Sequence, residues 1–282
     1  MDRCIIITAD DFGLCAGVNK AVALAHTKGV LTSASLMANM PNAEEAVSIA
    51  KKLPSLGVGL HLNVIQGGPL SKEKIVGCLA DSNGRFTYSL PKLLFLASVS
   101  ARIRKAIRTE FETQIQWLIS RGINPTHLDS HKHIHSFPFI YPMVCELARK
   151  YGIEKIRRPF EPAGVCRPPW PKPTNRGRAV ARKLRITARI NRLQNPVFLK
   201  NDALLGIAHT GSVSINYYEV VSLHNPFKTV EIMTHPGLTD GLDAMETRLV
   251  RQREVEFEAL CSDKTKQYFK NSDIKLVHYG NL

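Results

Sequence analysis

CIIITADDFG, residues Cys4–Gly13, is an apolar run that ends in two adjacent carboxylates and a glycine turn. Its first part, Cys4–Ala9, has the length and β-branched content of a buried strand. An amphipathic run, Ala16–Lys28, follows directly and has the length of a helix. A strand followed at once by a helix is the first half of a parallel βαβ unit. The stretch therefore predicts helices alternating with strands around a mostly parallel sheet.

The same alternation continues along the chain. The predicted strands are Cys4–Ala9, Thr32–Ala38, Gly57–Val64, Thr126–Ser130, Lys155–Arg158, Thr229–Thr234 and Lys275–His278. The predicted helices are Ala16–Lys28, Ala43–Leu53, Ala101–Arg121, Phe139–Tyr151, Tyr217–Leu223 and Ala244–Ser262. About seven such units in one chain favour a β/α barrel over an open sheet.

Two stretches interrupt the alternation. Gln66–Pro91 is rich in turn residues, so we expect a long loop after the third strand. Glu161–Asn201 begins with a proline-rich part and continues as a basic, helix-like run, Arg178–Leu193. Loops this long in a compact domain are usually functional or disordered. We therefore expect one domain over residues 1–282, with a basic, proline-rich insertion at about 161–201.

The positive charge of the chain is concentrated in one segment. The net charge is +14, and Arg167–Lys200 alone holds ten Lys and Arg and no Asp or Glu. A globally basic surface would suggest nucleic acid, but a single basic segment is weaker evidence. A nucleic-acid-binding protein stays open as an alternative and predicts salt-sensitive binding through this segment. A basic amphipathic helix at Arg178–Leu193 that touches anionic lipid is a further possibility, and it is compatible with an enzymatic activity of the same chain.

The cysteines and apolar runs point to a reduced, non-membrane environment. Six cysteines occur without any Cys-x-x-Cys pair, which is typical of buried thiols and disfavours a cysteine zinc site. The apolar run Leu93–Val99 is far shorter than the roughly 20 residues that a bilayer requires. No signal-peptide pattern is present at the N-terminus, so we expect a cytoplasmic location. The sequence does not fix an oligomeric state, and a homodimer stays open.

Polar residues stand at the ends of several predicted strands. Asp10 and Asp11 follow the first strand, His61 lies near the end of the third, and His235 ends the sixth. In a β/α barrel the carboxyl ends of the strands carry the active site. Each residue also has an ordinary structural explanation, since aspartates cap turns and a lone histidine is often a hydrogen-bonded core residue.

The segment His127–His135, HLDSHKHIH, is the strongest local signal. Its histidines and its aspartate occupy odd positions only. Side chains alternate faces along an extended strand, so Asp129, His131 and His133 are expected on one side. A surface histidine cluster is the alternative. Strict period two favours a metal-binding or catalytic role.

Together these residues predict a metal site. Asp11, His61 and His131 supply one carboxylate and two imidazoles from three strand ends, the three-ligand arrangement of catalytic metal centres. These ligands fit Zn²⁺ or another first-row divalent ion, whereas Mg²⁺ is less natural on imidazole. Asp129 is placed to orient a histidine ligand, and His133 and His135 are candidates for lining the pocket.

These motifs, in this order, resemble the YdjC-like carbohydrate deacetylases, a family that includes bacterial chitooligosaccharide deacetylases and hopanoid-associated relatives. The resemblance is close over about residues 3–160 and resumes near 229, whereas Arg167–Lys200 matches no motif of the family. The matching pieces are ADDFGL (9–14), TSASLM (32–37), VGLHL (58–62), HLDSHKHIH (127–135) and THPG (234–237).

The resemblance implies an α/β fold of the distorted TIM-like barrel type and an enzyme that removes acetate from an N-acetylated sugar, such as a chitooligosaccharide, glycan or glycolipid. It implies one divalent ion, Zn²⁺ or Mg²⁺, on Asp11, His61 and His131. Likeness to the wider deacetylase superfamily implies Asp10 as the base and His235 as the acid. Another metal-dependent amidohydrolase or a phosphoesterase stays open, because such clusters on barrels serve several chemistries.

Overall fold

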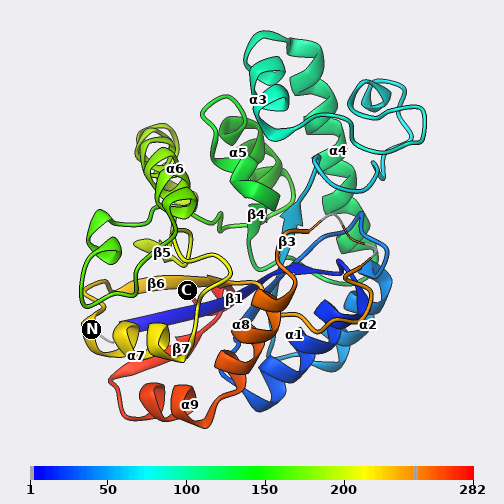
Figure 1. Ribbon diagram of the computed structural model, residues 1–282. Helices are drawn as coiled ribbons and strands as arrows, with labels where there is room; N and C mark the ends of the chain where they lie inside the picture. The colour runs from blue at the N-terminus through cyan, green and yellow to red at the C-terminus, as the bar shows by residue number, and fades with distance from the viewer. Residues whose placement is uncertain (1–2, 244, 246) are drawn as a thin grey trace.

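The computed structural model describes residues 3–282 apart from 244 and 246. Its centre is β1 (Arg3–Phe12), in which every residue from Ile5 onward is buried. A long, β-branched strand of this kind suits the middle of a parallel sheet that is covered on both faces. Figure 1 shows helices on both sides of the strands. On one side lie α4 (Ala101–Ser120), α5 (Tyr141–Lys150) and α6 (Asn175–Gln194), and opposite them lie α7 (Ile215–His224) and α9 (Asp263–Lys270).

The described residues form one parallel sheet of seven strands, six of which follow the order β4-β3-β2-β1-β6-β5 while the seventh, β7, pairs with β1. β7 pairs with the first half of β1, at Arg3–Ile6, and β2 pairs with its second half. The strands after β1 are β2 (Ser33–Leu36), β3 (Gly57–Leu62), β4 (Leu128–Ser130), β5 (Ala203–Leu205), β6 (Thr229–Thr234) and β7 (Ile274–Val277). Because all pairs are parallel, the carboxyl ends of the strands gather at one rim.

Residues 155–160 connect the two ends of this sheet. The amide of Leu128 in β4 donates to the carbonyl of Lys155, and the amide of Arg157 donates to the carbonyl of Leu128. At the other end, the amide of Leu204 in β5 donates to the carbonyl of Phe160. The sheet therefore curls into a distorted α/β barrel, which confirms the predicted fold class.

The helices are mostly where their amphipathic patterns predict them. They are α1 (Ala16–Lys28), α2 (Ala43–Lys52), α3 (Leu90–Val99), α4 (Ala101–Ser120), α5 (Tyr141–Lys150), α6 (Asn175–Gln194), α7 (Ile215–His224), α8 (Arg251–Cys261) and α9 (Asp263–Lys270). Short 3₁₀ turns are η1 (Val76–Leu79), η2 (His131–Ser136), η3 (Ala163–Cys166), η4 (Pro196–Phe198) and η5 (Tyr279–Asn281).

Five differences from the sequence prediction stand out. The predicted strand at Lys155–Arg158 is reduced to an isolated bridge at Ile156, and β5, α3 and α9 were not predicted. The predicted helix from Ala244 begins only at Arg251, and residue 244 itself lies outside the described residues. Among the helices that the structure describes, none is long and apolar enough to cross a bilayer.

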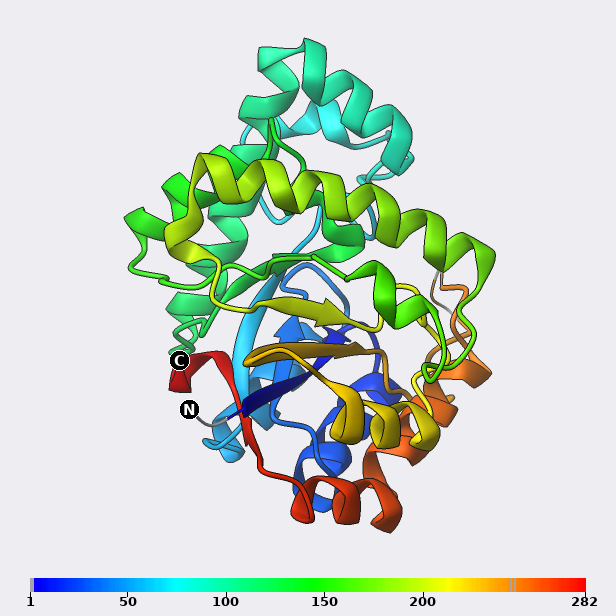
Figure 2. The same cartoon turned by 90° about the vertical axis from the view of Figure 1, so that its left-hand side faces the viewer.

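The basic segment is a helix on the outside of the barrel. Figure 2 shows α6 running along the surface with β5 beneath it. Ala181 and Leu184 of α6 pack in a small apolar cluster with Leu204, Ala208 and Met233, from β5, the loop after it and β6. The segment is thus attached to the barrel by a buried apolar face.

Candidate metal centre

The end of β1 carries two buried carboxylates that face the same site. Neighbouring residues of a regular strand point to opposite faces. Here the pairing of β1 with β2 shifts register between Ala9 and Phe12, and Asp11 has a left-handed φ of 66°. An irregularity of this kind redirects side chains at a strand end. As a result, Asp10 and Asp11 both have a carboxylate oxygen within 4.8 Å of a ring nitrogen of His61.

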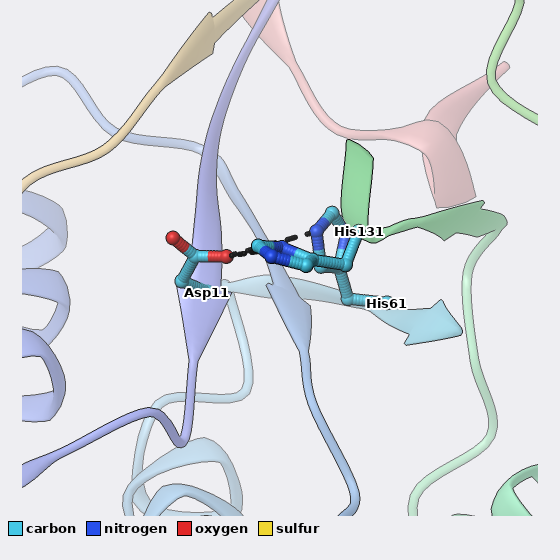
Figure 3. A group of neighbouring side chains, drawn as sticks. All are labelled: Asp11, His61 and His131. Carbon is cyan, nitrogen blue, oxygen red and sulfur yellow. Dashed lines mark ion pairs between the residues drawn. The ribbon is translucent and has the colours of Figure 1, made fainter. Parts of the chain in front are cut away.

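The structure brings Asp11, His61 and His131 together, as Figure 3 shows. Asp11 Oδ1 lies 3.2 Å from His131 Nδ1 and 3.8 Å from His61 Nε2. Asp11 ends β1, His61 belongs to β3, and His131 follows β4. The side chains of Asp11 and His61 are buried, and that of His131 is 16% exposed. The cluster thus has an approach from solvent on the His131 side.

The unsatisfied hydrogen bonding of these residues fits a divalent cation. Asp11 Oδ1 is buried and, among the described residues, accepts no hydrogen bond with acceptable geometry. A buried carboxylate oxygen without a donor is costly, and a cation between it and two imidazoles would remove that cost. His61 Nδ1 donates to Asp129 Oδ1 over 2.9 Å, which leaves Nε2 free toward Asp11. A carboxylate behind a ligating imidazole is the usual support of such a ligand.

A second group, Asp10, His61 and Asp129, also has the spacing of a metal site. Arg157, however, already occupies its carboxylates. Its guanidinium donates to both oxygens of Asp10, at 2.7 and 2.8 Å, and lies 2.5 Å from Asp129 Oδ2. The positive charge of Arg157 therefore takes the place that a cation would have there, and the Asp11 group is the better candidate.

Burial and neighbouring charges shift the pKa values of the three candidate ligands in different directions. Burial raises the pKa of Asp11, but the charge of Arg253 and the nearness of His131 outweigh it and hold this pKa well below its usual range. Burial lowers the pKa of His61, but Asp129 and Asp10 outweigh it and raise this pKa to about 9. Burial lowers the pKa of His131. In the metal-free protein at pH 7, Asp11 is thus ionised and His61 holds a proton that a metal must displace.

The buried Arg157 cluster was missed by the sequence analysis. Besides Asp10 and Asp129, Arg157 donates to Glu231 Oε1, and Glu231 Oε2 accepts a 2.6 Å bond from Tyr279. One guanidinium thus holds three carboxylates that come from different strands. The sequence does show an arginine in the predicted strand Lys155–Arg158 and a glutamate in an apolar predicted strand. Both are unusual in such strands, but no known spacing between them predicts that the two side chains meet.

Helix α8 supplies two further charged groups that sequence reasoning missed. Arg253 is buried and donates to Asp11 Oδ2 over 2.6 Å, so it occupies one oxygen of Asp11 and leaves the other for the histidines. Glu256, one turn later, accepts a 2.6 Å bond from the backbone amide of His235. Nothing in the helical pattern of α8 distinguishes these residues from surface charges.

His235 lies beside this cluster, with Nδ1 buried and 3.9 Å from Glu256 Oε2. Burial lowers the pKa of His235 to about 4, against the opposing charges of Asp11 and Asp10. Its imidazole is therefore neutral at pH 7.

The segment after Asp129 does not continue as a strand, so the predicted alternation at His131 and His133 is wrong. The strand ends at Ser130, and Lys132 and His133 take left-handed φ angles of 54° and 56°. A tight 3₁₀ turn, η2, thus brings His131 to Asp11.

The next two histidines of this segment, His133 and His135, are also buried. His133 Nδ1 has no hydrogen-bond partner in the part of the chain that the structure describes. His135 bonds through its two ring nitrogens to Ser130 Oγ and the carbonyl of Arg157.

Comparison with known proteins gives one consistent result. The model of the family described as YdjC-like protein matches residues 4–271. A protein named carbohydrate deacetylase from Brevibacillus brevis is 32% identical, over 99% of both chains. Another of that name from Vibrio cholerae is 31% identical, over 99% of this chain and 96% of its own.

The fold is shared with a solved structure. That of a proposed cellobiose-phosphate cleavage protein from Enterococcus faecalis superposes with a TM-score of 0.80, covering 100% of this chain and 99% of its own at 24% identity. At this identity the match is evidence of fold alone. The family match spans most of the chain, including the basic segment. The chain therefore belongs to the YdjC-like protein family.

Proposed function

We propose that this protein is a metal-dependent carbohydrate deacetylase that hydrolyses the N-acetyl group of an amino sugar and releases acetate. The observation that carries the proposal is the Asp11, His61 and His131 cluster, with its orphaned carboxylate oxygen, in a chain whose relatives over nearly full length are named carbohydrate deacetylase.

The three residues would hold one divalent cation, for which imidazole ligands favour Zn²⁺ while Mg²⁺ stays open. A bound divalent cation lowers the pKa of a water molecule and polarises an acetyl carbonyl. Asp129 orients His61, because its carboxylate fixes the Nδ1–H tautomer and leaves Nε2 toward Asp11. Arg157 holds the plane of the Asp10 carboxylate through two parallel bonds.

Asp10 and His235 are the proposed proton carriers. Amide hydrolysis requires a base for the attacking water and an acid for the departing amine. Asp10 is the proposed base, and His235 the proposed acid. Because His235 is neutral at pH 7, it can act as an acid only after it has itself gained a proton. The proton that Asp10 removes from water would therefore have to pass to His235 before His235 delivers it to the departing amine. His133 and His135 are buried residues of η2 itself and are proposed to support this side of the pocket.

The test is an acetate-release assay on N-acetylglucosamine and its short β-linked oligomers, run beside a phosphate-release assay on phosphosugars. The protein is first stripped of metal with a chelator and then reloaded with Zn²⁺ or Mg²⁺. We expect acetate release only after reloading and no phosphate release. Phosphate release without acetate release would overturn the proposal in favour of a phosphoesterase.

A further inference from the structure

The proposed function does not use the outward face of α6. A helix spaced at 3.6 residues per turn places positions i, i+4, i+7 and i+11 in one stripe. In α6 this stripe reads Arg182, Ile186, Arg189 and Leu193, and all four are exposed. The side chain of Ile186 is 58% exposed and that of Leu193 is 87% exposed. We call these four residues the α6 stripe.

The α6 stripe lies opposite the face that attaches the helix to the barrel. The buried residues of α6 are Ala181, Leu184, Thr187, Ala188 and Asn191. These residues form the face by which the helix packs on the barrel, and Ile186 and Leu193 are not part of that buried face. Exposed aliphatic side chains that alternate with arginines along one helix face indicate a surface that contacts another macromolecule or a membrane.

The charge around the stripe is uncompensated. In the part of the chain that the structure describes, neither Arg182 nor Arg189 lies within 4.0 Å of a carboxylate oxygen. The basic segment Arg167–Lys200 contains no acidic residue that could supply one. Next to it, burial and the positive charges of Arg192 and Arg189 lower the pKa of Arg158, against the charge of Asp202. The partner of this surface must therefore be anionic.

We propose that the α6 stripe docks the protein on an anionic lipid surface, with its arginines among the phosphate headgroups and Ile186 and Leu193 inserted between the acyl chains. A helix with basic and aliphatic side chains on its outer face is the form that lies in a bilayer interface. Nucleic acid fits less well, because the stripe has no aromatic ring on which bases stack. A second copy of this chain also fits less well, because pairing two α6 stripes would place their arginines against each other and the like charges would repel.

The docking face also has a direct connection to the candidate metal centre. Asn191 on the buried side of α6 donates from Nδ2 to the carbonyl of Ser136 over 2.8 Å, and Ser136 Oγ lies 3.3 Å from Thr187 Oγ1. Ser136 ends η2, the turn that begins with His131. A lipid-bound α6 would thus hold this side of the barrel at the membrane surface. The docking proposal does not depend on the reaction that the centre performs.

The test is co-sedimentation of the full chain with vesicles. Phosphatidylcholine vesicles containing phosphatidylglycerol are compared with vesicles of phosphatidylcholine alone, at low and high salt. We expect binding only to the anionic vesicles and its loss at high salt. In the double variant Arg182→Gln/Arg189→Gln the partition coefficient should fall roughly thirty-fold, the equivalent of about 2 kcal/mol for two basic residues at the surface. The partition coefficient of the variant Ile186→Ser/Leu193→Ser should also decrease.

Matched controls remove two exposed positive charges, or one exposed apolar side chain, from other helices. Lys51→Gln/Lys52→Gln in α2 removes two exposed charges, and Phe95→Ser in α3 removes an aromatic side chain that is 65% exposed. Both controls should bind the anionic vesicles like the unaltered protein. Equal binding to neutral vesicles, undiminished binding of the arginine variant, or binding to duplex DNA with none to vesicles would each overturn the proposal. Thermal unfolding confirms that every variant is folded.

Discussion

The support that Asp129 gives to His61 leads to a prediction with a characteristic pH dependence. The change Asp129→Asn keeps the shape of the side chain and removes its charge. Loss of a carboxylate behind a ligating histidine typically weakens metal binding about 10- to 100-fold. Asp129 also raises the pKa of His61, together with Asp10 and against burial, to about 9. At pH 7 the unaltered protein must therefore displace a proton from His61, which weakens its apparent affinity roughly 100-fold for two pH units.

These two effects oppose each other at pH 7 and separate at pH 9. In the variant, His61 loses the support of the Asp129 carboxylate, which weakens metal binding. The pKa of His61 is also lower in the variant, so a proton competes less with the metal for this imidazole. We expect similar Zn²⁺ affinities of variant and unaltered protein at pH 7, and a deficit of about 10- to 100-fold for the variant at pH 9. Calorimetry against a competing chelator measures both affinities. In buffers of different ionisation enthalpy it also counts released protons, which should be fewer for the variant at pH 7.

The control is Asp263→Asn, because the Asp263 side chain is 95% exposed and pairs only with Lys266 in the described structure. It should match the unaltered protein at both pH values. If Asp129→Asn binds Zn²⁺ as tightly as the unaltered protein at pH 9, and releases as many protons at pH 7, then Asp129 does not support a metal ligand.

Three further predictions concern the residues around this centre. Arg157→Met should lower the free energy of unfolding by about 3–5 kcal/mol, because it leaves three buried carboxylates without their cation; urea unfolding measures this, and a loss under 1 kcal/mol would contradict it. His235→Gln should keep its bound metal but release acetate about 10²- to 10⁴-fold more slowly; an unchanged rate would exclude His235 as proton carrier. Burial lowers the pKa of His135 to about 4, so the folded state binds fewer protons than the unfolded state, and the contribution of this group, about 3 kcal/mol, is present above pH 6.5 and lost as pH falls toward 4. NMR of the imidazole checks that prediction, which a titration near pH 6.5 would refute.

The fold was predictable where periodicity was long and unambiguous. The run Thr229–Thr234 and the helix Ala16–Lys28 have the predicted bounds, because an apolar strand and an amphipathic helix bury distinct faces. Ala203–Leu205 is too short to show a period, so β5 was missed. Alternation failed beyond Ser130 because the backbone turns there, with left-handed residues that carry no glycine signal.

The candidate site was predictable to the extent that parallel strands gather their carboxyl ends at one rim. That rule alone placed Asp11, His61 and His131 together, and the structure places them together. Arg157 and Arg253 complete the charge balance of the site, yet each is a single charged residue in its own segment. Arg157 is 147 residues from Asp10 in sequence, and Arg253 is 242 residues from Asp11. The sequence pattern around each arginine therefore cannot predict these contacts.

The most direct test of the account combines metal analysis and acetate release on the same sample of His131→Ala. Its control is His224→Ala, an exposed histidine at the end of α7. We predict that the unaltered protein and the control hold one divalent ion per chain and release acetate from an N-acetylated sugar, whereas folded His131→Ala does neither. Full acetate release by metal-free His131→Ala would contradict the account.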